Sequence, residues 1–420
     1  MLISPARACG VDFGTSNSTV GWLRPAAPTL LALEDGKPTL PSAVFFNADE
    51  ETTCYGRAAL AEYLEGYEGR LMRSLKSLLG SSLIDGQTEV HGRALPFRDL
   101  LASFLGELKR RAESEAGQRF DEAVLGRPVH FVDGDEAADR KAQDTLEAVA
   151  RQIGFRDVSF QFEPIGAALH YETSLAREEL VLVADIGGGT ADFSLVRLSP
   201  ERAGRDERRE DLLGNAGVHI GGTDFDRALS LECVMPLLGY RSRMKNGAEV
   251  PSSLFFQLAT WHTINFAYTR QAWSDLQHVY RGATARVELD RLSRLISRRE
   301  GHWLALQVEQ AKIDLSQAPV ASLQLDRLEA GLRHEIGREA FADATATLVA
   351  RVAAAVGELL AEAGVTRERV DTIYFTGGAS GVPQLRARIA AELPAARAVE
   401  GDLYGSIGAG LAVEAARRYG

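Results

Sequence analysis

The sequence predicts an α/β fold made of two related halves, and three observations support that class. Residues 180–196 run from a β-branched apolar strand through three consecutive glycines into a second strand. Residues 8–22 repeat this arrangement, with an apolar strand, an aspartate, a nearby glycine and a returning strand. Elsewhere short strands, such as those expected at 29–33 and 123–129, alternate with helices, such as the amphipathic one at 97–115 and another at 137–153. Two related hairpins far apart in one chain indicate two halves that face each other.

Length and composition are those of a soluble multidomain protein. The chain has 420 residues, of which 45% are apolar and 25% charged, so two or more globular domains are expected. Its formal net charge of −11 argues against non-specific nucleic-acid binding. Cys9, Cys54 and Cys233 show neither zinc spacing nor a disulfide framework. The first strand leaves no room for a signal peptide and no apolar run approaches a membrane span, so a reducing cytoplasm is the expected location.

The two glycine-containing hairpins predict a phosphate site. Glycine removes the Cβ atom, so the backbone N–H groups of such a turn can approach a bulky anion. Asp185 ends one strand, and Thr190 and Asp192 follow its turn, where they could hold a metal and its waters. Asp12 ends the corresponding strand of the first hairpin. Phosphates between the two turns would meet two sets of donors and two aspartates for Mg²⁺. A plain β-hairpin with a glycine-rich tip remains the alternative for either turn alone.

Both hairpins, together with motifs in the same order over almost the whole chain, resemble the actin-like ATPase superfamily. Within it the chain resembles the 70-kDa heat-shock chaperones, most of all their short bacterial relatives of the YegD type. The resemblance implies a duplicated, ribonuclease H-like fold with two lobes around a nucleotide cleft, and ATP or ADP with Mg²⁺ as ligands. It implies inner and outer subdomains at 1–37 with 117–175 (inner, lobe I), 38–116 (outer, lobe I), 176–228 with 338–420 (inner, lobe II) and 229–337 (outer, lobe II).

Two charged residues gain a role through this resemblance. The apolar positions of 71–79 share one helical face with Lys76 beside it, which alone indicates a solvated lysine. The family has a similar Lys-x-Leu-Ile-Gly segment whose lysine reaches the γ-phosphate and the attacking water, a task that suits a compact ammonium. Glu163 precedes Pro164, and the residues alone indicate a helix-start carboxylate favoured by the helix dipole. In the family's Glu-Pro-Thr-Ala-Ala segment, the glutamate contacts metal-bound water; Ile165 replaces the threonine.

The resemblance also implies a set of nucleotide contacts, including a strand-to-helix loop at 218–226 where Thr223 or Asp224 can cap the helix. The implied nucleotide-binding residues are Gly14, Thr15, Ser16, Gly187, Gly188, Gly189, Gly221, Gly222, Glu309, Lys312, Ser316, Gly377, Gly378 and Asp402. The implied catalytic residues are Lys76, Glu163, Asp185 and Thr190, and the implied metal ligands are Asp12 and Asp185.

The adenosine-binding motifs depart from the family pattern. Residues 308–316 resemble the family's Glu-x-Ala-Lys-x-x-Leu-Ser helix, which grips the adenosine. A surface ion pair between Glu309 and Lys312 is the alternative. Ile313 stands where the family usually has arginine, and Gly381 replaces the arginine that normally stacks on adenine. These departures weaken the expected base clamp.

The favoured function is an ATP-binding, slowly hydrolysing, chaperone-like switch that acts on an unknown protein partner. No acidic, leucine-rich linker and no β-rich peptide-binding domain is visible up to Gly420, so the usual client site is expected to lie outside this chain. The charge-dense stretch 201–211 is expected to be a solvated hairpin extension. Neither nucleic acid nor membrane is expected as a partner. The alternatives are a nucleotide-dependent scaffold or filament, a sugar or acetate kinase, and a non-hydrolysing nucleotide sensor. A P-loop ATPase is disfavoured because Gly-x4-Gly-Lys-[Ser/Thr] does not occur.

Overall fold

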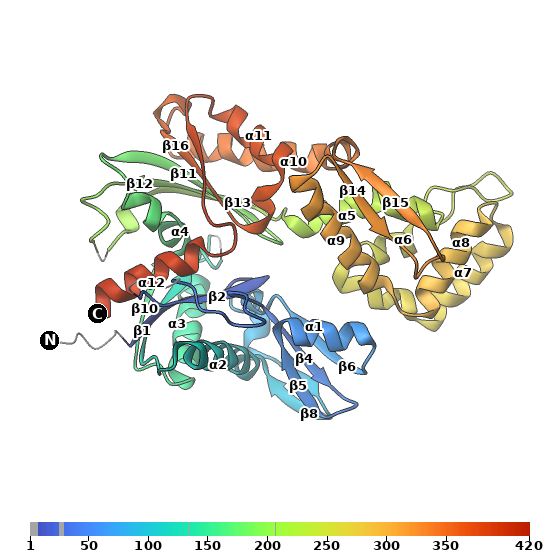
Figure 1. Ribbon diagram of the computed structural model, residues 1–420, viewed down its shortest axis with the longest axis horizontal. Helices are drawn as coiled ribbons and strands as arrows, with labels where there is room; N and C mark the ends of the chain where they lie inside the picture. The colour runs from blue at the N-terminus through green and yellow to red at the C-terminus, as the bar shows by residue number, and fades with distance from the viewer. Residues whose placement is uncertain (1–6, 25–28, 133, 206) are drawn as a thin grey trace. The chain divides into compact units, whose positions relative to one another are not determined.

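The structure, a computed structural model, describes residues 7–24, 29–132, 134–205 and 207–420 (Figure 1). The chain forms two compact units, and we describe each by itself. The first unit contains residues 1–217, 355–380 and 390–420, and the second contains 218–354 and 381–389. The division into four subdomains made from the sequence stays a prediction.

The first unit contains two five-stranded sheets with the same strand order. In each sheet a central strand pairs antiparallel with the strand that follows it and parallel with a strand from much later in the chain. The first sheet has the order β10 (Asp157–Phe162), β9 (Glu122–Arg127), β1 (Ala8–Asp12), β2 (Asn17–Gly21), β3 (Thr39–Pro41). The second has the order β17 (Arg397–Glu400), β16 (Thr372–Thr376), β11 (Glu179–Ile186), β12 (Ala191–Leu198), β13 (Leu212–Val218). The prediction of two related α/β halves is therefore confirmed.

Helices α4 (Glu163–Glu172) and α12 (Ser406–Tyr419) lie between the two sheets (Figure 1). Glycines allow α12 to cross the first sheet in direct backbone contact. A Cβ atom on Gly10 of β1 would overlap the backbone of Leu411 and Ala412. The first sheet also packs in one apolar core with α2 (Phe97–Ala116) and α3 (Glu136–Gln152), as their amphipathic patterns predict. This packing fixes the ends of β1 and β9, beside which the candidate site lies.

The remaining part of the first unit corrects two predictions. Residues 71–79 were expected to form a helix, but β6 pairs with β4, and Ser74 with φ 56° turns the chain into the short 3-10 helix η1. Pairing with β4 satisfies the backbone hydrogen-bonding groups of β6, and this tertiary contact overrides the local helical pattern. The strand expected from Thr29 to Leu33 is only an isolated bridge between Leu30 and Gly21. The elements here are β4 (Ala43–Asn47), β5 (Thr52–Tyr55), α1 (Gly56–Glu65), β6 (Gly69–Arg73), η1 (Leu75–Leu78), η2 (Ser82–Asp85), β7 (Gln87–Val90), β8 (Arg93–Pro96), η3 (Arg209–Asp211) and η7 (Arg367–Arg369).

The charged stretch 201–211 is exposed at most of its described residues, as its composition predicts, but Arg208 and Asp211 are buried. The Arg208 side chain is 1% exposed and donates to both carboxylate oxygens of Glu172, at 2.9 and 2.8 Å. It also pairs with Asp211, whose side chain is 2% exposed. Buried charges are tolerated where they are paired and hydrogen-bonded. The stretch is thereby fastened to the C-terminal end of α4, the helix that begins with Glu163.

The second unit is mostly helical around a core that includes Leu289, Leu292, Leu295 and Leu304, each at most 1% exposed. Its elements are α5 (Gly222–Leu229), η4 (Ser230–Val234), η5 (Met235–Leu238), α6 (Ser253–Leu258), η6 (Trp261–Tyr268), α7 (Arg270–Gly282), α8 (Arg286–Ser297), α9 (Gly301–Gln317), β14 (Val320–Gln324) and β15 (Arg333–Gly337). The elements shared between the units are α10 (Arg338–Glu362), η8 (Gly378–Gly381) and α11 (Pro383–Glu392).

One helix of the described chain, α10, is long and apolar enough to cross a membrane by length and composition alone. Within the protein 44% of its most apolar window is buried. Phe341, Val352 and Val356 are fully buried, which is also the pattern of a core helix in a water-soluble protein.

Candidate functional site

Four charged side chains converge in the first unit at the ends of β1 and β11. Asp12 is the last residue of β1 and is 8% exposed, and Asp185 lies near the end of β11. Lys76 lies in η1 and Glu163 is the first residue of α4. The Lys76 Nζ and Glu163 Oε1 atoms lie 2.5 Å apart, with side chains 13% and 12% exposed. Two strands, a 3-10 helix and an α-helix therefore bring together the four residues that the resemblance selected.

Burial and mutual repulsion strongly perturb these carboxyl groups. Burial, reinforced by the nearby Glu163 carboxylate, raises the pKa of Asp12 to about 8. Burial also raises the pKa of Asp185 to about 7, with further contributions from Asp192 and Glu163. Burial opposes the charge of Lys76, yet its pKa is raised because Glu163, Asp12 and Asp185 surround the ammonium with negative charge. Three carboxyl groups surround one ammonium, so an added cation would stabilise their charged forms.

The tips of the two predicted phosphate-binding hairpins approach each other. A Cβ atom on Gly188 would lie 2.3 Å from the Ser16 hydroxyl, so this hydroxyl would have to move to admit a side chain there. A Cβ atom on Gly14 would likewise overlap the carbonyl oxygen of Asn17. The second turn is closed by the Gly187 N–H, which donates to the carbonyl oxygen of Thr190 at 2.9 Å. The glycines therefore permit close approach of backbone to backbone and leave the turns narrow.

The threonine of the second hairpin and the end of β16 complete this face of the first unit. The Thr190 hydroxyl donates to Asp192 Oδ2 at 2.7 Å. Gly377, at the end of β16, has φ 80°, and a Cβ atom there would overlap Asp185. The next residue, Gly378, lies under the ring of Tyr404: a Cβ on this glycine would be 2.7 Å from Tyr404 Cε1. The β16 turn is thus adjacent to the carboxylate cluster.

Asp402 and Tyr404 form the loop that leads into α12. The Tyr404 backbone N–H donates to Asp402 Oδ1 at 3.0 Å, and the Ser406 hydroxyl donates to the Asp402 carbonyl oxygen at 2.6 Å. Tyr404 is 51% exposed, so most of its ring faces solvent beside the glycine turn. Sequence reasoning missed this tyrosine because no local pattern distinguishes it from an ordinary surface residue.

In the second unit, Lys312 belongs to a buried pair that the sequence did not reveal. Its Nζ atom lies 2.9 Å from Asp226 Oδ2 and donates to the Gly222 carbonyl oxygen at 3.2 Å. Burial raises the pKa of Asp226 to about 6 even though Lys312 opposes that shift. Glu309 is exposed, and the Ser316 hydroxyl donates to the Lys312 carbonyl oxygen at 3.2 Å. The lysine therefore pairs with a carboxylate of α5 and not with Glu309.

The helix that follows Gly221 begins in the way its sequence predicts. The Gly221 N–H donates to Asp224 Oδ2 at 3.0 Å, which confirms Asp224 as a capping residue of α5. Gly221 and Gly222 are buried at the start of this helix. A helix N-terminus of this kind favours anions, because its first N–H groups lack partners within the helix.

A family model described as "Hsp70 protein" matches residues 8–235 and 290–416. The chain belongs to the Hsp70 family. It is similar to the chaperone protein HscA of Citrobacter koseri, with 27% identity over 426 residues that cover 96% of this chain and 57% of the relative. It is also similar to the chaperone protein DnaK of Deinococcus deserti, with 25% identity over 406 residues that cover 91% of this chain and 55% of the relative. The chain thus spans little more than half the length of these Hsp70 relatives.

Hsp70 membership sets the fold as that of an actin-like ATPase, and Hsp70 proteins in general bind ATP or ADP with Mg²⁺. Among the described residues, no three His, Cys, Asp or Glu side chains lie close enough together to hold a metal ion by themselves. Mg²⁺ does not need such a group, because it keeps several waters and uses one or two carboxylates plus substrate phosphates. Asp12 and Asp185 fit this kind of site, since both are carboxylates whose burial disfavours the charged form until a cation is near.

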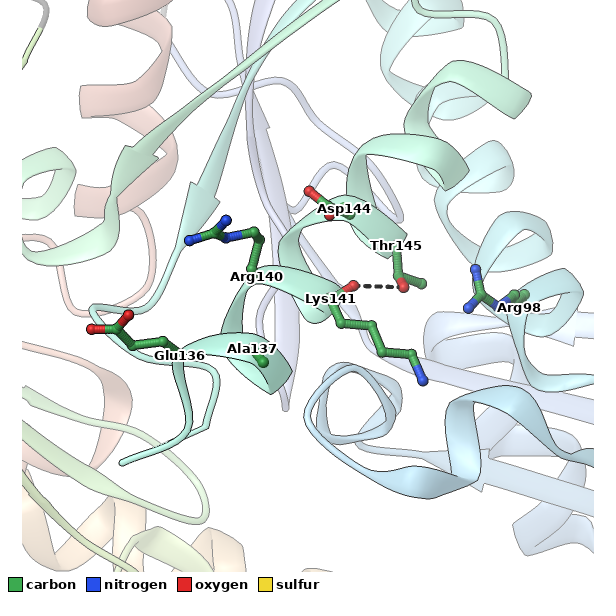
Figure 2. Close-up of a pocket in the computed structure, with 7 residues that line it drawn as sticks. All are labelled: Arg98, Glu136, Ala137, Arg140, Lys141, Asp144 and Thr145. Carbon is green, nitrogen blue, oxygen red and sulfur yellow. Dashed lines mark hydrogen bonds between the residues drawn. The ribbon is translucent and has the colours of Figure 1, made fainter.

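A further cavity of the described chain lies away from these Hsp70 motifs. It is an open groove of about 540 Å³ along the N-terminal half of α3, and Figure 2 shows its lining residues. Two of its three basic lining residues, Arg98 and Lys141, pair with Asp85. Since the groove contains none of the predicted site residues, we do not assign it to the nucleotide.

Proposed function

We propose that this Hsp70-family chain binds Mg-ATP and Mg-ADP and hydrolyses ATP slowly, as a nucleotide-controlled switch. The observation that supports this most directly is the Lys76–Glu163 pair at 2.5 Å, flanked by Asp12 and Asp185 in a buried cluster. An ammonium so closely surrounded by carboxylates is positioned by them. It is available to a phosphate group whose negative charge would replace theirs.

The proposed chemistry depends on positioned charge. Asp12 and Asp185 would hold Mg²⁺ mainly through its waters; bound Mg²⁺ would neutralise charge on the phosphate oxygens. Lys76 would stabilise the negative charge that develops on the transferred phosphoryl group, and Glu163 would fix the lysine and orient a water for in-line attack. Thr190, bonded to Asp192, would help to orient the same water. No covalent intermediate on the protein is needed.

The backbone of the two hairpins would bind the phosphates. Gly14, Thr15 and Ser16 would act from the first hairpin and residues 187–189 from the second. In the second unit, Gly221 and Gly222 would offer the N-terminus of α5.

For the adenosine, we propose contacts from Gly377, Gly378 and Asp402 in the first unit. Residues Glu309, Lys312 and Ser316 are the proposed contacts in the second unit. A change in closure of the two lobes on nucleotide exchange would be the output, and a protein partner would respond to it. We propose the cytoplasm as the location.

Calorimetric titration with Mg-ATP and Mg-ADP, followed by single-turnover hydrolysis of radiolabelled ATP, tests the proposal. Saturable binding of both nucleotides with cleavage of the bound ATP is the expected result. The same titration of the Asp12→Asn variant tests whether the nucleotide binds at the proposed site, because this variant should bind Mg-nucleotide more weakly than the wild type. The absence of binding by the wild-type protein would refute the proposed function.

A second candidate is a sensor that binds nucleotide without hydrolysing it. Gly381 and Ile313 favour this function because they replace the two arginines of the usual base clamp, and Ile313 is 38% exposed. In the same experiment, binding without cleavage in a single turnover would select the sensor.

A further inference from the structure

Residues 236–289 lie between the two ranges that match the Hsp70 family model, yet they form ordered structure of their own in the second unit. They contain α6, η6 and α7, which gather beside α8 (Figure 1). This helical cluster encloses a cavity of about 240 Å³ that contains none of the residues proposed to bind nucleotide. A structure specific to this segment, together with a cavity, indicates a function that the family motifs do not describe.

The cavity has a buried apolar floor and an exposed aromatic wall. Val250, Phe255, Leu276 and Leu292 are at most 5% exposed and line the cavity. Phe266 lines it from η6 and is 58% exposed. A phenylalanine left largely in water costs roughly 1–2 kcal/mol relative to burial. Single exposed apolar side chains are common on protein surfaces, whereas exposed apolar groups that gather in one place mark contact surfaces. Phe266 belongs to the second kind, because it forms part of the wall of an apolar cavity.

Further exposed aromatic side chains belong to the same helical cluster. Phe256 of α6 and Trp273 of α7 are each 38% exposed. Tryptophan and other aromatic side chains are enriched where protein interfaces bury their central residues. Neither residue lines the cavity, but both are next in sequence to residues that do, Phe255 and Ala272. Aromatic side chains exposed on the same helices favour a polypeptide over a small molecule as the occupant.

Among the residues that the structure describes, Asp275 is the one charged residue that lines the cavity. The Gln271 side-chain amide donates to Asp275 Oδ1 at 2.8 Å, which fixes the carboxylate on the exposed face of α7. Arg270 and Arg281 lie towards the two ends of α7, but neither lines the cavity. An apolar cavity with a single oriented carboxylate complements an apolar group that carries a neighbouring positive charge.

We propose that this cavity binds one large apolar side chain of a partner polypeptide, with an adjacent lysine or arginine paired to Asp275. The volume suits a single leucine, methionine, phenylalanine or tryptophan side chain and is smaller than the roughly 300–1,000 Å³ typical of small-molecule sites. The inference does not depend on the proposed ATPase activity, because every residue that it uses lies in 250–292 of the second unit.

A library of immobilised random decapeptides, probed with the purified full chain, tests the proposal. Peptides captured by the wild-type protein should be enriched in a large apolar residue next to lysine or arginine. The strongest of them, labelled with fluorescein, then serves as the probe for anisotropy titrations. Ala272→Trp, which places a large ring in the cavity, should weaken its binding by about tenfold or more. Phe266→Ser changes an exposed wall residue and should weaken it as well, without a loss of core packing.

Asp275→Asn should weaken binding of the same probe about threefold, and the difference should shrink at high salt. Asp314→Asn is the matched control, because Gln310 donates to Asp314 at 2.8 Å in the same i, i+4 arrangement on α9. That variant should bind like the wild type. Enrichment of acidic peptides, no enrichment, or unchanged binding by Ala272→Trp and Phe266→Ser would overturn the proposal. Concentration-dependent self-association that Phe266→Ser abolishes would identify a second copy of the chain as the occupant and would also overturn it.

Discussion

Replacing Asp12 by asparagine is expected to reduce the pH dependence of stability of the nucleotide-free protein. Burial and the Glu163 carboxylate raise the Asp12 pKa from 3.8 to about 8 in the folded state. Between these pH values the folded protein holds a proton that the unfolded chain has released. The free energy of unfolding therefore falls as the pH rises through this window. Asparagine has a similar shape and does not titrate, so its contribution to the free energy of unfolding does not change with pH.

The size of the effect follows from the proton count. A difference of one bound proton changes the free energy of unfolding by about 1.4 kcal/mol per pH unit. From pH 5.5 to 7.5 Asp12 alone would account for at most about 2.7 kcal/mol. Lys76 opposes the shift, and local relaxation lowers it further. We expect on the order of 1–2 kcal/mol less loss of stability over this range in the variant. Asp185, whose pKa is about 7, should account for much of the remaining slope.

Urea unfolding followed by circular dichroism at pH 5.5, 6.5 and 7.5 measures this effect, with EDTA present so that no divalent cation competes with the proton. Each unfolding transition is fitted separately, since the two units need not unfold together, and the effect is expected in the transition of the unit that contains Asp12. Asp144→Asn is the control, because Asp144 is an exposed aspartate in the same unit. If the wild type and Asp12→Asn lose stability in parallel as the pH rises, the reasoning about the buried carboxyl group is wrong.

Three further substitutions test other contacts. Lys76→Ala should retain nucleotide binding but hydrolyse ATP about a hundredfold more slowly or worse, because the ammonium that Glu163 positions would no longer stabilise charge on the transferred phosphoryl group. Unchanged single-turnover cleavage would contradict the role assigned to Lys76. Arg208→Ala should lower the free energy of unfolding by about 3–5 kcal/mol, since Glu172 would stay buried without its partner, and equal unfolding midpoints would exclude this. Tyr404→Ala should weaken Mg-ADP binding severalfold in calorimetry, because the exposed ring of Tyr404 is expected to pack on the nucleoside. Tyr404→Phe keeps the ring and should bind like the wild type.

The parts of the fold that the sequence predicted are those with local causes. Asp12 and Asp185 lie at strand ends because apolar β-branched runs stop at glycine, and the structure confirms both hairpins. The amphipathic stripe of 97–115 likewise predicted α2, and the helix expected at 137–153 is α3, each to within a residue. Their roles at the site stay predictions, although Asp12, Asp185, Lys76 and Glu163 do lie together.

The parts that the sequence did not predict depend on contacts between distant segments. The helix expected at 71–79 is divided between strand β6 and the 3-10 helix η1, because β4, in an earlier segment of the chain, offers β6 backbone partners. Arg208 was expected in solvent, and its burial depends on Glu172. Lys312 was weighed against Glu309 on its own helix, while its partner Asp226 lies 86 residues away. No window of sequence around any of these residues contains the partner that decides its position.

The contact between α12 and β1 has a consequence for how the protein is made. Leu411 and Ala412, in the helix that covers Gly10, leave the ribosome roughly 400 residues after Gly10 does. At roughly 5–20 residues per second, the first sheet waits on the order of a minute for this helix during synthesis. For that time one face of an apolar sheet has no permanent cover. The nascent chain therefore depends on a temporary shield, or on rapid later collapse, to avoid aggregation before its amino-terminal strand is finally packed.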